Sequence, residues 1–282
     1  MELIAASRVI KAQNAARATL PYTRELNRAV SAVVSHTLFY ERGEHPLTQE
    51  VENPRRVALL FLTSDRGMNG AYSTNAIKTA SKAASRMRER GMEVKRYVVG
   101  RKGVAYLNFR QLPYAKAWEG FSDAPTYAHA KEIADVLIED FQTPYEEGGV
   151  DEIHAVYTRM ESMITQTPRV RRLLPLEVVE GVHEVGEGEL TPSYRFEPDA
   201  ETVLEELMPL YIRNRVWFYL LQASASQLAS QQRAMKAATD NAEQLIQDLT
   251  RQVNQARQAV ITQEISEIVG GASALAEATA QE

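Results

Sequence analysis

The spacing of apolar residues divides the chain into two helical ends and a middle part that alternates between strands and helices. Residues 1–40 contain no Gly and one Pro, and Leu26, Val30 and Val33 recur at helical spacing. This pattern predicts a long N-terminal helix that bends near Pro21. Four short apolar runs predict strands. They cover residues 57–63, 93–99, 150–157 and 169–176.

Helical patterns separate these strands. They run from residue 72 to 90, from Lys102 over a short stretch, and from 127 to 141, and an irregular segment holds Trp118 and Pro125. Strands that alternate with helices indicate a parallel sheet covered on both faces. The sequence therefore predicts a Rossmann-like, three-layer α/β domain.

The C-terminal part has a different character. Pro198 with Asp199 marks a helix start. No Pro or Gly lies between Leu210 and Val269, and a helix over these 60 residues would extend ~90 Å. Apolar residues in it recur at steps of three and four, the period of a coiled-coil seam. The seam comprises Ile246, Leu249, Val253, Ala256 and Val260.

We expect this seam to pair with the helix of residues 1–40 in a long antiparallel two-helix coiled coil, although two ordinary bundle helices are the alternative interpretation. Residues 1–40 carry five basic and two acidic side chains, whereas 199–282 carry six basic and eleven acidic ones. Opposite charge favours their association modestly. The predicted organisation is an N-terminal coiled-coil helix over 1–40, an α/β domain over 55–197 and a C-terminal coiled-coil helix over 198–282.

Composition narrows the class of protein. Hydrophobic residues make up 44% and charged residues 24% of the 282 residues, which is typical of a folded soluble chain. A formal charge of −5 argues against a nucleic-acid binder with a strongly basic surface, and the lack of cysteine excludes disulfides and thiolate sites. No run reaches the ~20 apolar residues of a membrane-spanning helix, and the first residues do not resemble a signal peptide. We therefore expect membrane association through partners only.

One loop is a candidate binding site. Residues 64–70, with the sequence Ser-Asp-Arg-Gly-Met-Asn-Gly, lie between a predicted strand and a helix, where α/β folds bind phosphate on backbone amides. The loop matches neither common phosphate-binding glycine motif and lacks the phosphate-facing lysine, so a structural turn is favoured. The alternative function that rests on this loop is a nucleotide- or phosphate-binding α/β enzyme with a helical oligomerisation arm.

The remaining polar groups predict no catalytic, cofactor or metal site. The histidines are scattered at positions 36, 45, 129, 154 and 183 without ligand spacing. An acidic cluster could chelate a hard cation, but it is more typical of a solvated turn. It comprises Glu177, Glu180, Glu184, Glu187 and Glu189. Arg169, Arg171 and Arg172 fit an exposed strand better than an anion site.

Several segments resemble the ATP synthase gamma subunit family in order along the whole chain. The longest is Ile261 to Ala274, and the others are 2–8, 64–70, 97–103 and 235–242. Residues 120–127 are closest to actinobacterial members. Two features depart from the family pattern: the family has roughly two dozen residues before the position of Met1, so we expect the start of the N-terminal helix to precede this sequence, and Asn69 replaces a small residue or cysteine.

This resemblance implies a non-catalytic central rotor shaft of an F-type ATP synthase, which couples proton flow through the membrane sector to ATP synthesis at the alpha/beta ring. It implies alpha, beta and epsilon subunits and the membrane c-ring as partners, and a peripheral location on the cytoplasmic face of the bacterial cell membrane. It also implies that Arg257, Gln258, Thr262 and Glu264 contact a beta subunit. Helix geometry is compatible with this, since we expect Arg257, Gln258 and Thr262 to occupy adjoining surface beside the apolar seam and Glu264 to lie further round. A coiled-coil adaptor with a purely structural role is the third hypothesis.

Overall fold

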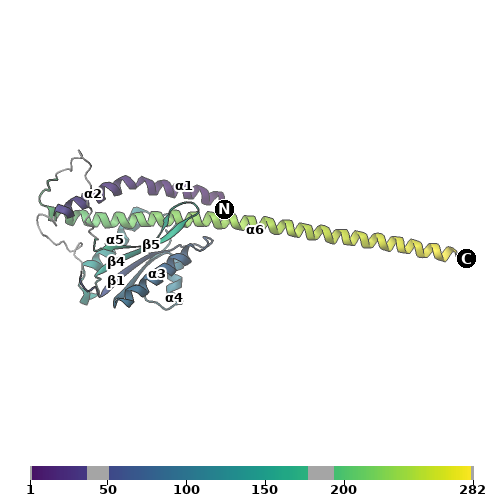
Figure 1. Ribbon diagram of the computed structural model, residues 1–282, viewed down its shortest axis with the longest axis horizontal. Helices are drawn as coiled ribbons and strands as arrows, with labels where there is room; N and C mark the ends of the chain where they lie inside the picture. Colours follow the sequence, from purple (N-terminus) through teal and green to yellow (C-terminus); the bar gives the residue numbers. More distant parts are fainter. Residues whose placement is uncertain (1, 37–50, 177–193, 281–282) are drawn as a thin grey trace, which may run out of the picture. The chain divides into compact units, whose positions relative to one another are not determined.

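The computed structural model describes residues 2–36, 51–176 and 194–280, and their packing forms two units that meet between Ala234 and Met235. Figure 1 shows the elements in chain order. The helices are α1 (Glu2–Ala18), α2 (Leu20–His36), α3 (Tyr72–Glu89), α4 (Arg101–Phe109), α5 (Tyr127–Gln142) and α6 (Ala200–Ala280), with a 3-10 turn at Tyr145–Glu147. The strands are β1 (Arg56–Leu62), β2 (Glu93–Val99), β3 (Lys116–Trp118), β4 (Glu152–Met160) and β5 (Gln166–Leu174).

The first unit is built on a five-stranded sheet in the order β3-β2-β1-β4-β5. β1, β2, β3 and β4 are parallel, and β5 pairs with β4 in the antiparallel direction. β1 lies at the centre, and its residues from Val57 to Leu62 are all buried, as its unbroken apolar run predicts. β5 is an edge strand, and its exposed Arg169 and Arg171 discourage pairing with another chain.

Helices cover both faces of this sheet, which confirms the three-layer α/β prediction. On one face, Leu59 and Phe61 pack against the small residues of α3 and against Leu107 of α4. On the other face, Leu60 and Leu62 belong to one core cluster with residues of α5, α2 and α6. The three-residue β3 lies in a segment predicted to be irregular, because a strand this short shows no apolar period.

The N-terminal helix is divided rather than continuous. α1 ends at Ala18 and α2 begins at Leu20, so the break falls at Thr19, two residues before the predicted bend at Pro21. Proline has no backbone N–H, and its ring clashes with the carbonyl four residues earlier. The Thr19 side chain caps the break by donating its hydroxyl to the Ala16 carbonyl at 2.9 Å.

The two N-terminal helices run antiparallel to α6, as predicted, but they pair with an earlier part of it. Val9 of α1 packs on Leu228, and Thr23 of α2 accepts a 3.0 Å hydrogen bond from Asn214. The described contacts of α1 and α2 with α6 therefore lie at Asn214 and Leu228, before the seam that begins at Ile246.

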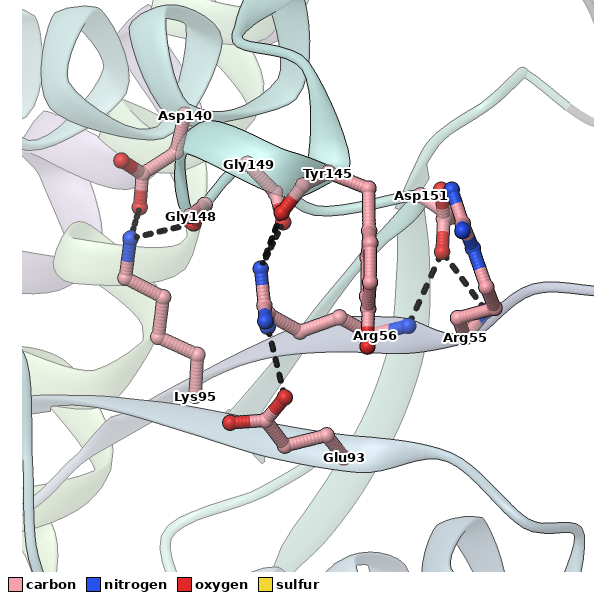
Figure 2. Close-up of polar contacts among 9 residues, drawn as sticks. All are labelled: Arg55, Arg56, Glu93, Lys95, Asp140, Tyr145, Gly148, Gly149 and Asp151. Carbon is pink, nitrogen blue, oxygen red and sulfur yellow. Dashed lines mark hydrogen bonds and ion pairs between the residues drawn. The ribbon is translucent and has the colours of Figure 1, made fainter.

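The amino ends of β1 and β2 are fixed by a polar network around Arg56 (Figure 2). The Arg56 side chain donates hydrogen bonds to the carbonyls of Tyr145 and Gly149, both at 2.9 Å, and to Glu93 at 2.8 Å. Asp151 accepts hydrogen bonds from the backbone N–H groups of Arg55 and Arg56 at 2.6 and 2.9 Å. The network holds the connection between α5 and β4 against the sheet.

Two further contacts strengthen this connection. Lys95 lies 2.8 Å from an Asp140 carboxylate oxygen and donates to the Gly148 carbonyl at 3.0 Å. Gly149 packs so tightly that a β-carbon would lie 1.7 Å from the Thr143 carbonyl oxygen, so no other residue fits there without a backbone shift. The amino ends of the strands are therefore fixed by polar contacts rather than by the apolar core.

We predict that Arg56→Met lowers the free energy of unfolding by about 2–4 kcal/mol, because it removes three charge-assisted hydrogen bonds of a largely buried guanidinium. The matched control is Arg55→Met. Arg55 is more than half exposed and stacks on the Tyr145 ring at 3.8 Å, so its loss should cost less than about 1 kcal/mol. Urea unfolding of both variants measures the difference, and equal effects would contradict the assigned role of Arg56.

Candidate functional site

The loop 64–70 lies at the carboxyl ends of the parallel strands, the usual ligand position of an α/β sheet. Its centre is the Asp65 carboxylate, which accepts hydrogen bonds from the backbone N–H of Arg101 at 3.1 Å and of Ser122 at 2.9 Å. The Asp65 N–H donates in turn to the Ser122 hydroxyl at 2.8 Å. Asp65 therefore ties together the segments that follow β1, β2 and β3.

This arrangement disfavours phosphate binding at the loop. Burial raises the pKa of the Asp65 carboxyl, but hydrogen bonds from the backbone of Gly120, Ser122 and Arg101 outweigh burial and hold the pKa below its usual range. The carboxylate is thus ionised and already occupies the amide at the start of α4. An incoming phosphate would meet a negative charge there.

The other side of the loop is held by hydrogen bonds within the loop and to the start of α3. The Ser64 and Ser73 hydroxyls lie 2.6 Å apart, and the Asn69 side-chain amide donates to the Ser64 hydroxyl at 2.7 Å. Asn69, which departs from the family pattern, is therefore a buried structural residue in this chain. The segment is a hydrogen-bonded turn, as the sequence favoured.

The glycines of the 97–103 motif allow α4 to approach the end of β1. Gly100 has φ +97°, and a β-carbon there would lie 2.5 Å from the Thr63 carbonyl oxygen. A β-carbon at Gly103 would lie 2.5 Å from a methyl group of Val98 and 2.9 Å from the Thr63 hydroxyl. Close backbone packing, not ligand binding, explains this motif.

His129 and His154 have structural partners, and His36 lies at the end of α2. His129 bonds to Thr126 at the start of α5 and stacks on Phe121 at 3.9 Å. His154 lies 2.7 Å from Glu152. Residues 2–36, 51–176 and 194–280 hold no group of three potential metal ligands. His45, His183 and the acidic cluster from Glu177 to Glu189 lie outside the described residues.

The predicted partner-contact residues lie on the part of α6 that forms the second unit. Arg257, Gln258, Thr262 and Glu264 are all exposed on this helix. The Thr262 hydroxyl donates to the Gln258 carbonyl at 2.8 Å, so these two residues are neighbours one turn apart. Glu264 follows Arg257 by two turns with an offset of only ~20°, so it lies nearly in line with Arg257 rather than further round.

The second unit also carries an apolar stripe beside the polar cluster of Arg257, Gln258, Thr262 and Glu264. Large apolar side chains of the second unit are 44–72% exposed. They are Leu245, Ile246, Leu249, Val253, Val260, Ile261, Ile265, Ile268 and Val269. Exposed apolar surface on this scale is typical of a binding surface. The described residues contain no helix of the length and apolar character that crossing a membrane requires.

The sequence did not reveal how α6 is held in the first unit. Within residues 223–230 of α6 every side chain is buried, and three serines in this stretch donate hydrogen bonds to other elements. Ser224 donates to the Asp123 carbonyl, Ser226 to the Thr158 carbonyl and Ser230 to the Gln166 side chain, at 2.9–3.1 Å. A run of small residues without an apolar period is the only sequence signal of this all-round burial.

Charged side chains add to this attachment. Arg213 of α6 forms a 2.6 Å ion pair with Asp135 of α5, and Arg233 donates to the Ile164 carbonyl at the turn between β4 and β5. Asn214 is 1% exposed and bonds to Thr23. In the first unit, α6 is therefore held by contacts with α1, α2, α5 and the β4–β5 hairpin.

Comparisons with known proteins identify similar chains over the whole length. Residues 1–275 match the family model described as ATP synthase. The chain is 58% identical to the ATP synthase gamma chain of Cutibacterium acnes, over 100% of this chain and 92% of that protein. It is 55% identical to the ATP synthase gamma chain of Thermobifida fusca, over 99% and 91%.

Solved structures show the same fold at lower identity. A chain of the Euglena gracilis mitochondrial ATP synthase, in an assembly of OSCP, F1 and c-ring, aligns with a TM-score of 0.57 and 16% identity over 97% of this chain and 94% of that chain. A chain of the Tetrahymena thermophila mitochondrial ATP synthase central stalk and c-ring aligns with a TM-score of 0.55 and 21% identity, over 84% and 99%.

We predict that Asp65→Asn destabilises the protein by about 1–2 kcal/mol at pH 7, because hydrogen bonds to a charged acceptor become bonds to a neutral one. The folded-state pKa of Asp65 is lowered, so its contribution is present above the unfolded-state pKa of ~3.9 and is lost as the pH falls through the folded-state value. The difference in melting temperature between the wild-type chain and Asp65→Asn should therefore become smaller below about pH 4.

The control is Glu119→Gln, since Glu119 is 40% exposed and lies 3.5 Å from Arg101. This change should shift stability by less than ~0.5 kcal/mol at any pH. A pH-independent effect of Asp65→Asn, or none at pH 7, would show that the carboxylate does not hold the loop.

Proposed function

This chain belongs to the ATP synthase gamma chain family, whose members are the non-catalytic central stalk subunit of F1, and from that premise we propose that it turns as a rotor shaft within its complex. In this role it couples proton flow through the membrane sector to ATP synthesis on other subunits. The chain itself transmits torque and carries out no chemistry.

One observation carries the proposal. The same helix, α6, is buried on all sides in the first unit over residues 223–230 and forms the whole described part of the second unit, with an exposed apolar stripe. An element built into a rigid domain transmits force, and an element with an exposed apolar surface binds partners. α6 combines both properties.

Rotation would act on nucleotide sites through differential contact. An asymmetric helix presents different side chains to each of three surrounding beta subunits in turn. A beta site changes its nucleotide affinity only in so far as the shaft binds its alternative conformations with different free energy. The polar cluster and the apolar stripe of the second unit offer such contacts, because neither is symmetric around the helix axis.

The partners follow from this role. Two of the structurally similar chains come from assemblies that contain a c-ring, and one of these also contains F1. We propose that the second unit enters the alpha/beta ring and that the first unit contacts epsilon and the c-ring. The complex would lie on the cytoplasmic face of the bacterial cell membrane, with this chain bound peripherally through its partners.

The test of the function is affinity purification of the tagged chain from its native cells, followed by subunit identification and ATPase assay. Recovery of alpha, beta, epsilon and c subunits with ATPase activity supports the rotor. Recovery of other partners without ATPase activity would indicate a structural adaptor instead. Stoichiometric binding of ATP or NAD by the isolated chain, measured by calorimetry, would indicate the nucleotide-binding enzyme.

We predict that Gln258→Ala or Thr262→Ala lowers coupled ATP turnover several-fold in the assembled complex while assembly and nucleotide binding by beta stay intact. Each change removes a polar group that could bond to beta in only one rotary state. ATP hydrolysis and proton pumping of the purified complex measure the effect. Arg257→Ala, Glu264→Ala and the four-residue combination complete the series.

Matched controls lie on the same helix. Thr250 donates its hydroxyl to the Ile246 carbonyl at 2.8 Å, the same internal bond that Thr262 makes. Thr250→Ala therefore controls for the loss of a helical threonine, and Gln255→Ala for the loss of an exposed glutamine. Full activity in the four-residue variant would show that this cluster does not form the contact with beta.

A further inference from the structure

A cavity of about 330 Å³ opens between α3 and α4 on the sheet face opposite α6. Its floor is apolar and includes Leu59 and Phe61 of β1 and Leu107 of α4. Three arginines also line it, at positions 88, 96 and 110. None of the four residues assigned to the contact with beta lines this cavity, and its size lies at the lower end of small-molecule sites.

The three arginines converge from different elements without a carboxylate among them. Arg88 comes from α3, Arg96 from β2, and Arg110 directly follows α4. Among the residues that the structure describes, none of the three forms an ion pair. Arg88 and Arg110 are exposed. Arg88 donates to the Ala84 carbonyl at 3.2 Å, Arg96 donates to the Pro113 carbonyl at 3.4 Å, and Arg110 bonds to the Tyr106 hydroxyl.

Arg96 is the most unusual of the three. It is only 8% exposed, yet one long hydrogen bond engages its guanidinium, which carries five N–H donors. Burial lowers the pKa of Arg96, and the nearby Arg88 cation lowers it further. A buried cation without a counter-charge is costly unless a ligand compensates it.

Two hydroxyl groups complete the wall beside these cations. The Ser81 and Tyr106 hydroxyls lie 3.2 Å apart. The hydrogen bond with Ser81 lowers the pKa of Tyr106, burial opposes it, and the Arg110 and Arg96 cations lower it further. The wall is therefore electropositive and rich in donors, whereas the floor is apolar.

We propose that this cavity binds a small organic phosphate, a phosphate monoester whose apolar or aromatic body lies on the Leu59–Phe61–Leu107 floor. Guanidinium groups bind phosphate oxygens in pairs of parallel hydrogen bonds. Three cations match a dianionic phosphate better than a single carboxylate. The proposal does not rest on the contact with beta, because the cavity lies on the opposite face of the sheet from α6.

The test uses the full chain and phenyl phosphate as probe, with binding measured by calorimetry and by phosphorus NMR at fixed ionic strength. We expect saturable binding at one site. Phenyl phosphate should bind at least ~5-fold more tightly than inorganic phosphate, because its ring buries apolar area on the floor. Phenol, which has the ring without the charge, should not bind measurably.

Variants separate the cavity from the general surface. Arg96→Gln and Arg88→Gln should each weaken phenyl phosphate binding ~10-fold or more. Arg86→Gln is the matched control, since Arg86 lies on α3 two residues before Arg88, is exposed and does not line the cavity. Ser85→Phe keeps all three arginines but places a ring in the cavity mouth, and it should abolish binding.

Thermal unfolding of each variant establishes that it is folded before its binding is compared. Absence of phenyl phosphate binding by the wild-type chain would overturn the proposal. Equal weakening by Arg86→Gln and Arg96→Gln would overturn it as well, because the binding would then reflect surface charge alone. Unchanged binding in the folded Ser85→Phe variant would also overturn it, since the anion would then lie outside the cavity.

Discussion

The structure depends on the burial of one helix. Over residues 204–230, α6 lies between the sheet and the N-terminal helices, and from 223 to 230 its side chains are buried on every side. Only small residues allow neighbours to approach a helix from all directions, and their serines supply hydrogen bonds where apolar area is small. Every other element of the first unit either packs on α6 or supports the sheet beneath it.

The two ends of the strands show how this domain differs from α/β enzymes of similar topology. At the carboxyl edge, where such folds bind cofactors, the Asp65 carboxylate satisfies backbone N–H groups that a phosphate would otherwise take. At the amino edge, Arg56 and Lys95 bond to the carbonyls of the connection that follows α5. At both ends of the strands, charged side chains of the domain itself hydrogen-bond to the backbone. These bonds hold the connecting segments in place, and at the carboxyl ends they take the N–H groups that a ligand would need.

The second unit follows the opposite principle. The large apolar side chains of its helix are 44–72% exposed. Exposed apolar surface of this kind is typical of a binding surface. The first unit hydrogen-bonds its polar groups internally, whereas the second unit exposes apolar side chains. This contrast fits the rotor role.

The sequence by itself determined the family, four of the five strands of the sheet and the length of α6, because these depend on local motifs and on apolar period. The three-residue β3 is too short to show such a period. It also predicted the bend near Pro21 and the antiparallel sense of the helix pair. Only the tertiary structure decided the register of that pair, the role of Asp65 and the convergence of Arg88, Arg96 and Arg110. Each of these depends on residues from different strands and helices, and no spacing along the chain encodes the distance between them.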